Sequence, residues 1–178
     1  MIKPLFKRLL GVSIISVGML GSNFAFAQAM PVVCAGYKVS PTKVPGQRTG
    51  KKVTAAYEAY SADLMDEAIE LLKEIEAKDP FDRAYVDRFL GNLLASQEGQ
   101  GELALDYLLR SVTEKELNDG DHASTLRLLG DLNMQQRKYD QALDFYQRWM
   151  TFTCKEDADV YTRMSQAYYE TKQLPKMI

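Results

Sequence analysis

Small residues recur at a nearly constant spacing along this chain. Gly91 and Gly130 lie in similar apolar runs, and Ala68, Ala104 and Ala142 follow one another at almost the same interval that separates the two glycines. The apolar residues around them follow the i, i+3, i+4 period of an amphipathic helix. Two antiparallel helices approach closely only where a side chain is nearly absent. A glycine in one helix and an alanine in the next therefore predict a repeated pair of helices.

Helix-breaking residues separate the predicted helices. Asp79-Pro80, Gly99-Gln100-Gly101 and Asp119-Gly120-Asp121 each suit the end of one helix or the start of the next. No segment shows the sustained alternation of a strand. We therefore expect an all-α fold over residues 53–178, with about three and a half helix pairs.

The pattern resembles the tetratricopeptide-repeat family, whose unit is a helix pair of about 34 residues. The third unit is most similar, at Gly130, Tyr139, Ala142 and Tyr146, whereas Ala56 replaces the usual glycine in the first. The resemblance implies a right-handed superhelical solenoid whose concave face is lined by the first helix of each pair.

The fourth unit is incomplete. Its first helix covers about residues 157–171, and only residues 174–178 remain for the second. Since each repeat buries its apolar side on the next, the face formed by Tyr161, Met164 and Tyr168 would lack a cover. We expect a further part of the chain or another molecule to cover it. The alternative is that residues 174–178 fray and the exposed patch is small.

Residues 1–27 have the three parts of a secretory signal peptide. Basic Lys3, Lys7 and Arg8 precede an apolar stretch that runs from Leu9 to Leu20, and Ala25-Phe26-Ala27 gives a small-x-small cleavage site. A transmembrane anchor is the alternative, but a spanning helix needs about 20 apolar residues. We predict cleavage near Ala27, release into the periplasm and no stable membrane span afterwards.

Residues 28–52 contain three prolines and three glycines, which predict an extended leader. Cys34 lies in this leader, and Cys154 lies at the end of the third pair. An oxidising periplasm permits a disulfide between them. Two free thiols, or bridges to other chains, are the alternatives, because the sequence does not supply the required Cβ geometry.

The sequence contains no catalytic or cofactor motif. His122 is the only histidine, so we expect it in the first turn of a helix and expect no metal site. Gly99-Gln100-Gly101 lacks the Gly-Lys-Ser/Thr of a phosphate loop. Acidic residues outnumber basic ones, and the more so once the three basic residues of the signal peptide are removed, which suits nucleic acid poorly. We expect a protein that is not an enzyme, has no cofactor and binds no nucleic acid.

In tetratricopeptide repeats, peptide partners lie along the concave face. Carried over residue by residue, the resemblance places these residues in the partner-binding groove, from the first unit to the fourth: Tyr57, Tyr60, Tyr85, Arg88, Asn92, Ser96, Ser124, Arg127, Asp131, Met134, Thr162, Gln166 and Tyr169. Tyrosine and arginine are frequent interface anchors. We expect Arg88, Asn92 and Arg127 to act in binding and not in stability; the alternative is a solvated helix face.

A narrower resemblance lies in residues 31–37 (Pro-Val-Val-Cys-Ala-Gly-Tyr) and 84–92 (Ala-Tyr-Val-Asp-Arg-Phe-Leu-Gly-Asn). These segments are similar to periplasmic repeat proteins that accompany TonB energy-transduction systems in marine gamma-proteobacteria. The similarity implies an accessory of TonB-dependent uptake of iron complexes or similar nutrients. The expected function is a periplasmic scaffold that binds envelope proteins or peptides. The alternatives are an adaptor for envelope assembly (outer-membrane, secretin or cell-wall machinery) and the non-catalytic part of a larger enzyme.

Overall fold

The computed structural model describes residues 31–176, so the predicted signal peptide lies outside the described residues. This part of the chain forms seven α-helices and no strand, which confirms the all-α prediction. The helices are α1 (Gln47–Ser61), α2 (Met65–Lys73), α3 (Pro80–Ala95), α4 (Gly101–Thr113), α5 (Asp119–Gln135), α6 (Tyr139–Thr153) and α7 (Ala158–Glu170), followed by the 3-10 helix η1 (Leu174–Lys176).

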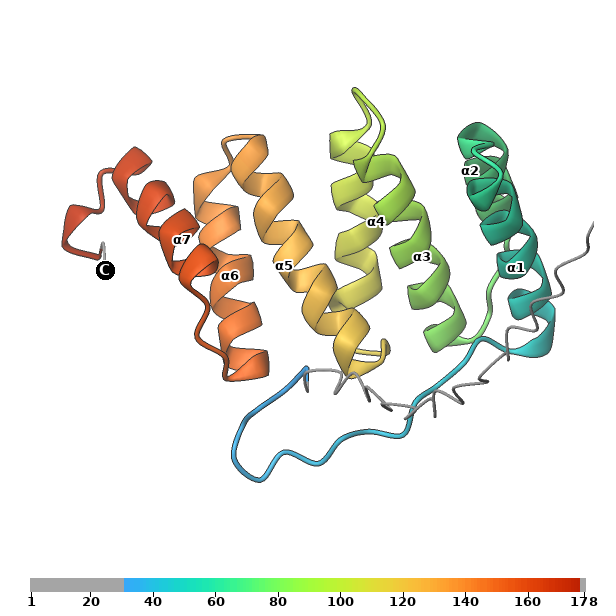
Figure 1. Cartoon of the computed structure of the whole chain (residues 1–178), viewed down its shortest axis with the longest axis horizontal. Helices are drawn as coiled ribbons and strands as arrows, with labels where there is room; N and C mark the ends of the chain where they lie inside the picture. Colours follow the sequence, from blue (N-terminus) through green and yellow to red (C-terminus); the bar gives the residue numbers. More distant parts are fainter. Residues whose placement is uncertain (1–30, 177–178) are drawn as a thin grey trace, which may run out of the picture.

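The helices stand side by side in chain order (Figure 1). The closest packing joins α1 to α2, α3 to α4 and α5 to α6, and contacts of α2 with α3, α4 with α5 and α6 with α7 link one pair to the next. Helices α4 and α6 lie behind α3, α5 and α7 in Figure 1. One apolar core extends from Val53 in α1 to Met164 in α7. The arrangement is repeat-like, as the spacing of the small residues predicts.

Gly91 and Gly130 mark the closest approach between the helices of their pairs. A methyl group at Gly91 would lie 2.7 Å from Cγ of Leu108, and one at Gly130 would lie 2.5 Å from Cε1 of Tyr146. Leu108 and Tyr146 are themselves completely buried. The glycines therefore serve close packing, which is the role that the sequence assigns to them.

Side-chain caps define two of the helix starts. Asp79 accepts hydrogen bonds from the backbone N–H groups of Phe81 and Asp82, and Pro80 is the first residue of α3. Asp157 accepts in the same way at the start of α7, from the N–H groups of residues 159 and 160. A proline fits the first helical turn because its missing N–H would have no partner there. The predicted boundary at Asp79-Pro80 is confirmed.

The predicted leader of residues 28–52 is too long at its carboxyl end. Helix α1 begins at Gln47, so it includes residues 47–52. Gly50 lies inside this helix and its N–H donates to the Gly46 carbonyl at 2.7 Å. A single glycine costs a helix only about 1 kcal/mol, which the packing of a tertiary structure outweighs.

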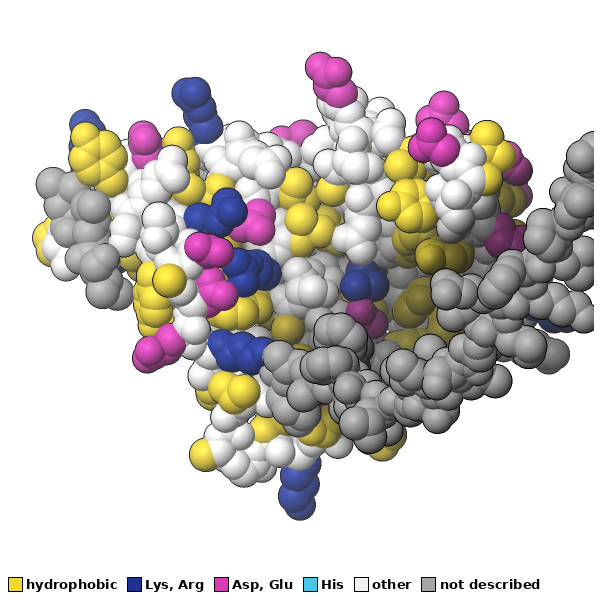
Figure 2. Space-filling view, in the orientation of Figure 1, with side chains coloured by type: hydrophobic (Ala, Val, Ile, Leu, Met, Phe, Trp, Pro, Cys, Tyr) yellow, Lys and Arg dark blue, Asp and Glu magenta, His cyan; other side chains and the backbone are white. Residues whose placement is uncertain are grey.

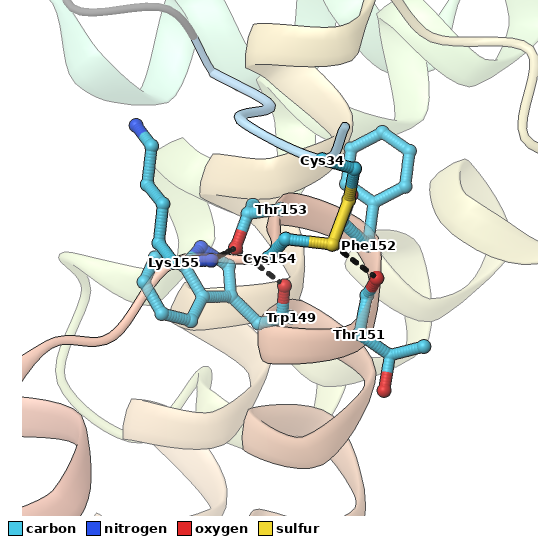
Figure 3. The surroundings of a disulfide bond; sticks show 7 residues. All are labelled: Cys34, Trp149, Thr151, Phe152, Thr153, Cys154 and Lys155. Carbon is cyan, nitrogen blue, oxygen red and sulfur yellow. Dashed lines mark hydrogen bonds between the residues drawn. A yellow bond between two sulfur atoms is a disulfide. The ribbon is translucent and has the colours of Figure 1, made fainter. Parts of the chain in front are cut away.

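Residues 31–46 form an extended segment, which we call the strap, that passes beneath the helix row from α6 to α1 (Figure 1). At the α6 end, the Val33 N–H donates to the Thr153 carbonyl at 2.8 Å. Next to it, Cys34 and Cys154 form a disulfide across a sequence separation of 120 residues (Figure 3). The two cysteines that the sequence leaves unassigned thus fasten the strap to the carboxyl end of α6.

The strap is also hydrogen-bonded to α5 and α3. The Tyr37 hydroxyl donates to Asp119 Oδ1 at 2.8 Å, and Lys43 and Asn118 exchange two hydrogen bonds at 2.8 and 3.0 Å. The Gly46 N–H then donates to Asp82 Oδ1 at 2.9 Å. The strap therefore contacts residues at or beside the amino-terminal ends of α5 and α3 before it enters α1.

At the carboxyl-terminal end of the row, Tyr161, Met164 and Tyr168 were expected to form an uncovered face. This expectation is wrong for Met164, the central residue of the three. Met164 is only 4% exposed, and Tyr161 and Tyr168 are half-buried. Residues 174–176 follow α7 as the short 3-10 helix η1.

Replacing Gly130 with alanine should destabilise the fold, because the new methyl group overlaps the buried Tyr146 ring. We expect a loss of about 1–3 kcal/mol in the free energy of unfolding, measured by urea titration. Gly120→Ala is the matched control, since a methyl group at Gly120 in α5 meets nothing within 4 Å. The control should be neutral or up to about 1 kcal/mol more stable. Equal destabilisation by both changes would contradict the close-packing interpretation.

Removing the disulfide should have a large effect, because it closes a loop across a sequence separation of 120 residues. By chain entropy, the double change Cys34→Ser and Cys154→Ser should lower the free energy of unfolding by about 4–5 kcal/mol. Reduction of the unmodified protein should produce the same loss. If the double variant unfolds at the same urea concentration as the oxidised protein, the strap does not hold the helix row.

Candidate protein-binding face

All predicted groove residues lie on α1, α3, α5 or α7, apart from Ser96, which is the C-cap of α3. Figure 2 views the molecule from the side on which α3, α5 and α7 lie in front. The structure separates the predicted residues into an aromatic group at the amino-terminal end and a charged group over the later helices.

The aromatic group lies over α1 and α3, and we call Tyr57, Tyr60 and Phe89 the aromatic patch. Tyr57 is 59% exposed and Tyr60 is 43% exposed. The rings of Tyr57 and Tyr60 lie 6.5 Å apart, as do those of Tyr60 and Phe89. Figure 2 shows hydrophobic side chains gathered over these two helices. Two tyrosine rings thus stand in solvent beside a half-buried phenylalanine.

The charged group is a series of ion pairs between successive first helices, which we call the ion-pair ladder. Arg88 of α3 pairs with Asp121 of α5 at 2.8 Å, and Arg127 of α5 pairs with Asp157 at the start of α7 at 3.0 Å. Arg163 of α7 lies 3.5 Å from Asp131 of α5. Figure 2 shows basic and acidic side chains alternating over this region.

The structure places Arg88 and Arg127 in ion pairs between helices, whereas we expected them from the sequence to act in partner binding alone. The side chains of Arg88 and Arg127 are only 23% and 32% exposed. The Arg127 guanidinium also lies over the Trp149 ring, 5.7 Å from its centre. Each arginine has an acidic partner from the following unit, so its charge is already compensated within the protein.

The ladder extends into the core through Asp131. This carboxylate accepts a hydrogen bond from the hydroxyl of the buried Tyr146 at 2.7 Å. Burial, together with this carboxylate, raises the pKa of Tyr146. At the next position along the ladder, hydrogen bonding from the Val160 N–H and the charge of Arg127 lower the pKa of Asp157. Asp131 thus bonds to a buried side chain of α6, and Asp157 bonds to the backbone at the start of α7.

The other predicted residues do not form a common site with the patch. The hydroxyls of Ser96, Ser124 and Thr162 donate to carbonyls three or four residues earlier in the chain. Asn92, Tyr85 and Met134 are half-buried, whereas Gln166 and Tyr169 are exposed on α7.

Sequence reasoning missed Phe89 in the aromatic patch and the acidic partners Asp121 and Asp157 in the ladder. A signal was present, because Asp121 follows Arg88 at nearly the same interval at which Asp157 follows Arg127. Both intervals are close to one repeat unit of about 34 residues. An acid about one unit after a basic residue therefore indicates pairing across first helices.

His122 lies in the first turn of α5, as predicted, and lines a hollow together with Cys34 and Tyr37 of the strap. It is 6% exposed, its ring is 4.8 Å from that of Phe152, and its Nδ1 has no hydrogen-bond partner in the described part of the chain. Burial, followed by the charges of Lys115 and Arg148, lowers the pKa of His122 to about 4, against a smaller opposing effect of Asp119. Over residues 31–176, no cluster of three His, Cys, Asp or Glu residues could hold a metal ion.

Comparison with known proteins gives no assignment: no protein-family model matches the chain, and no curated protein sequence matches it. Among the helices of residues 31–176, none is long and apolar enough to cross a membrane.

Acidification should destabilise the protein through His122. Its folded pKa of about 4 lies below the ordinary value of 6.5, so between these values the unfolded chain binds more protons. The contribution is fully present above about pH 6.5 and falls as the pH is lowered, by about 2 kcal/mol at about pH 5. Urea titrations at several pH values should show this loss. His122→Phe should remove that part of the pH dependence, and an unchanged slope would contradict the assignment.

Proposed function

We propose that this chain is a non-enzymatic, periplasmic scaffold that binds other proteins through the aromatic patch. The observation that carries the proposal is the exposure of Tyr57 and Tyr60, at 59% and 43%, on the face formed by alternate helices. Tyrosine provides a large contact area at a low cost in side-chain entropy, and it is enriched among the residues that dominate binding energy. The ladder residues serve as the support of this face, because their charges are paired.

The proposal includes the fold family. The close helix contacts at Gly91 and Gly130 and the fully buried Ala68, Ala104 and Ala142 support an interpretation as a right-handed solenoid of tetratricopeptide type. Stacked helix pairs of this kind present extended surfaces that bind peptides or proteins.

The proposal also includes the compartment. A disulfide between Cys34 and Cys154 is stable in an oxidising environment, which supports export to the periplasm. The signal-like pattern of residues 1–27 supports the same location. Within that compartment, the resemblance of residues 31–37 and 84–92 favours a component of a TonB-dependent uptake system as the partner.

Site-specific photo-crosslinking tests this function. A photoreactive phenylalanine analogue placed at Tyr57 should crosslink to a distinct envelope protein, which mass spectrometry then identifies. The same analogue at Glu67, an exposed residue of α2, is the control and should give no such product. Adding Tyr60→Ala should reduce the Tyr57 product about tenfold, as expected for the loss of an interface anchor, without changing the urea midpoint. Identical products at both positions would contradict a role of the aromatic patch.

A further inference from the structure

A hollow lies on the side of the helix row opposite the aromatic patch, between α4 and α6. Helix α5 packs against both, so its residues Leu129 and Asn133 form the floor, and the volume is about 610 Å³. We call this hollow the α4–α6 groove. In Figure 1, α5 lies in front of α4 and α6, so the groove opens away from the aromatic patch.

The inner surface of the groove is apolar. Leu105 of α4 and Phe145 of α6 are 9% and 8% exposed and continue the floor. Leu109, one turn beyond Leu105 on α4, is 43% exposed and stands on the wall. An apolar side chain of a partner that covered Leu109 would contribute about 25 cal/mol of binding free energy for each Å² of apolar surface removed from water.

The rims of the groove are acidic. Glu102 and Asp106 line it from α4, and Asp140 and Asp144 line it from α6, each pair separated by one helical turn. Lys138 and Arg148 are the only basic residues in the lining, so its acidic residues outnumber its basic ones by two. The groove therefore combines an apolar floor with two parallel acidic rims.

Three of the four rim carboxylates have an internal ion-pair partner, and only the pair of Glu102 is shorter than 3.5 Å. Lys138 holds Glu102 closely, at 2.6 Å, but Arg148 lies 3.7 Å from Asp144. Arg110 lies 3.9 Å from Asp106. In the described part of the chain, Asp140 has no ion-pair partner. The helix dipole favours carboxylates near the amino terminus of a helix. This accounts for Glu102 and Asp140, which lie in the first turns of α4 and α6, but not for Asp106 and Asp144 one turn later.

The groove is not an automatic result of the repeat. One pair earlier, the hollow against α2 is lined by the end of α3 and the α3–α4 loop, and its volume is only about 230 Å³. Its lining is mainly polar, with Ile69 and Leu94 as the only apolar members. The hollow at α4–α6 is therefore larger and more apolar than the one beside α2.

We propose that the α4–α6 groove binds a cationic amphipathic helix of a partner protein. The apolar side of that helix covers Leu109 and the floor, and its lysine or arginine side chains reach the acidic rims on both sides. Charge complementarity selects this partner, because an acidic or neutral helix would not offset the excess of acidic residues in the lining. This goes beyond the proposed function, since the groove and the aromatic patch lie on opposite sides and can be occupied together.

A designed peptide tests the proposal. The probe is a fluorescent peptide of about 14 residues, or roughly four helical turns, with leucine on one side and lysine on the other. A second probe has glutamate in place of lysine. In fluorescence anisotropy with the full chain, the lysine peptide should bind, more weakly at high salt, and the glutamate peptide should not. Leu109→Asn, and separately Asp106→Asn with Asp144→Asn, should each weaken binding about tenfold.

Matched controls locate the peptide. Asp66→Asn with Glu70→Gln removes the same number of charges from the hollow beside α2, and Tyr57→Ala alters the aromatic patch; both should leave the affinity unchanged. Thermal melts establish that each variant is folded.

Failure of the lysine peptide to bind, equal binding of both peptides, or loss of binding with Tyr57→Ala would overturn the proposal. So would a dimer of the free chain that Leu109→Asn dissociates, because a second copy would then occupy the groove. None of these results bears on crosslinking at Tyr57.

Discussion

The absence of a side chain at Gly130 allows the contact on which much of the structure depends. Tyr146 packs into the space left at Gly130 with its ring completely buried. From this position its hydroxyl donates to Asp131 Oδ1 at 2.7 Å. Asp131 in turn lies 3.5 Å from Arg163 of the next first helix. One close helix contact therefore fixes a helix pair and also positions a rung of the ion-pair ladder.

A row of helix pairs has mostly local contacts, since each pair packs against its neighbours. The strap changes this, because it joins the end of α6 to the start of α1 through a disulfide and hydrogen bonds to α5 and α3. Residues 34 and 154 enclose the three consecutive pairs from α1 to α6. The cross-link reduces the freedom of the unfolded chain, and the bonds along the strap also tie together the ends of helices that are distant in sequence.

The sequence predicts those features that are local. The spacing of Gly91, Gly130 and the alanines indicates helix pairs because a helix period and a close contact are both visible in a short segment. The path of the strap was not predictable, since the contact of Tyr37 with Asp119 joins residues 82 apart. The ion pairs of Arg88 and Arg127 were missed for the same reason, because their acidic partners lie in the next unit. The α4–α6 groove was missed because Leu105 and Phe145 follow the same helix period as ordinary core residues.

The ladder and the strap act on different parts of the candidate face. Ion pairs join α3 to α5 and α5 to α7, but in residues 31–176 no ion pair joins α1 to α3. The link at the start of α1 is the hydrogen bond from the Gly46 N–H at the end of the strap to Asp82 of α3. Helix α1 carries Tyr57 and Tyr60, so the strap, together with the packing of α1 on α2 and of α2 on α3, holds these rings relative to Phe89. A surface held in one arrangement loses less entropy when it binds, and here a covalent cross-link at α6 supports an aromatic patch at the other end of the row.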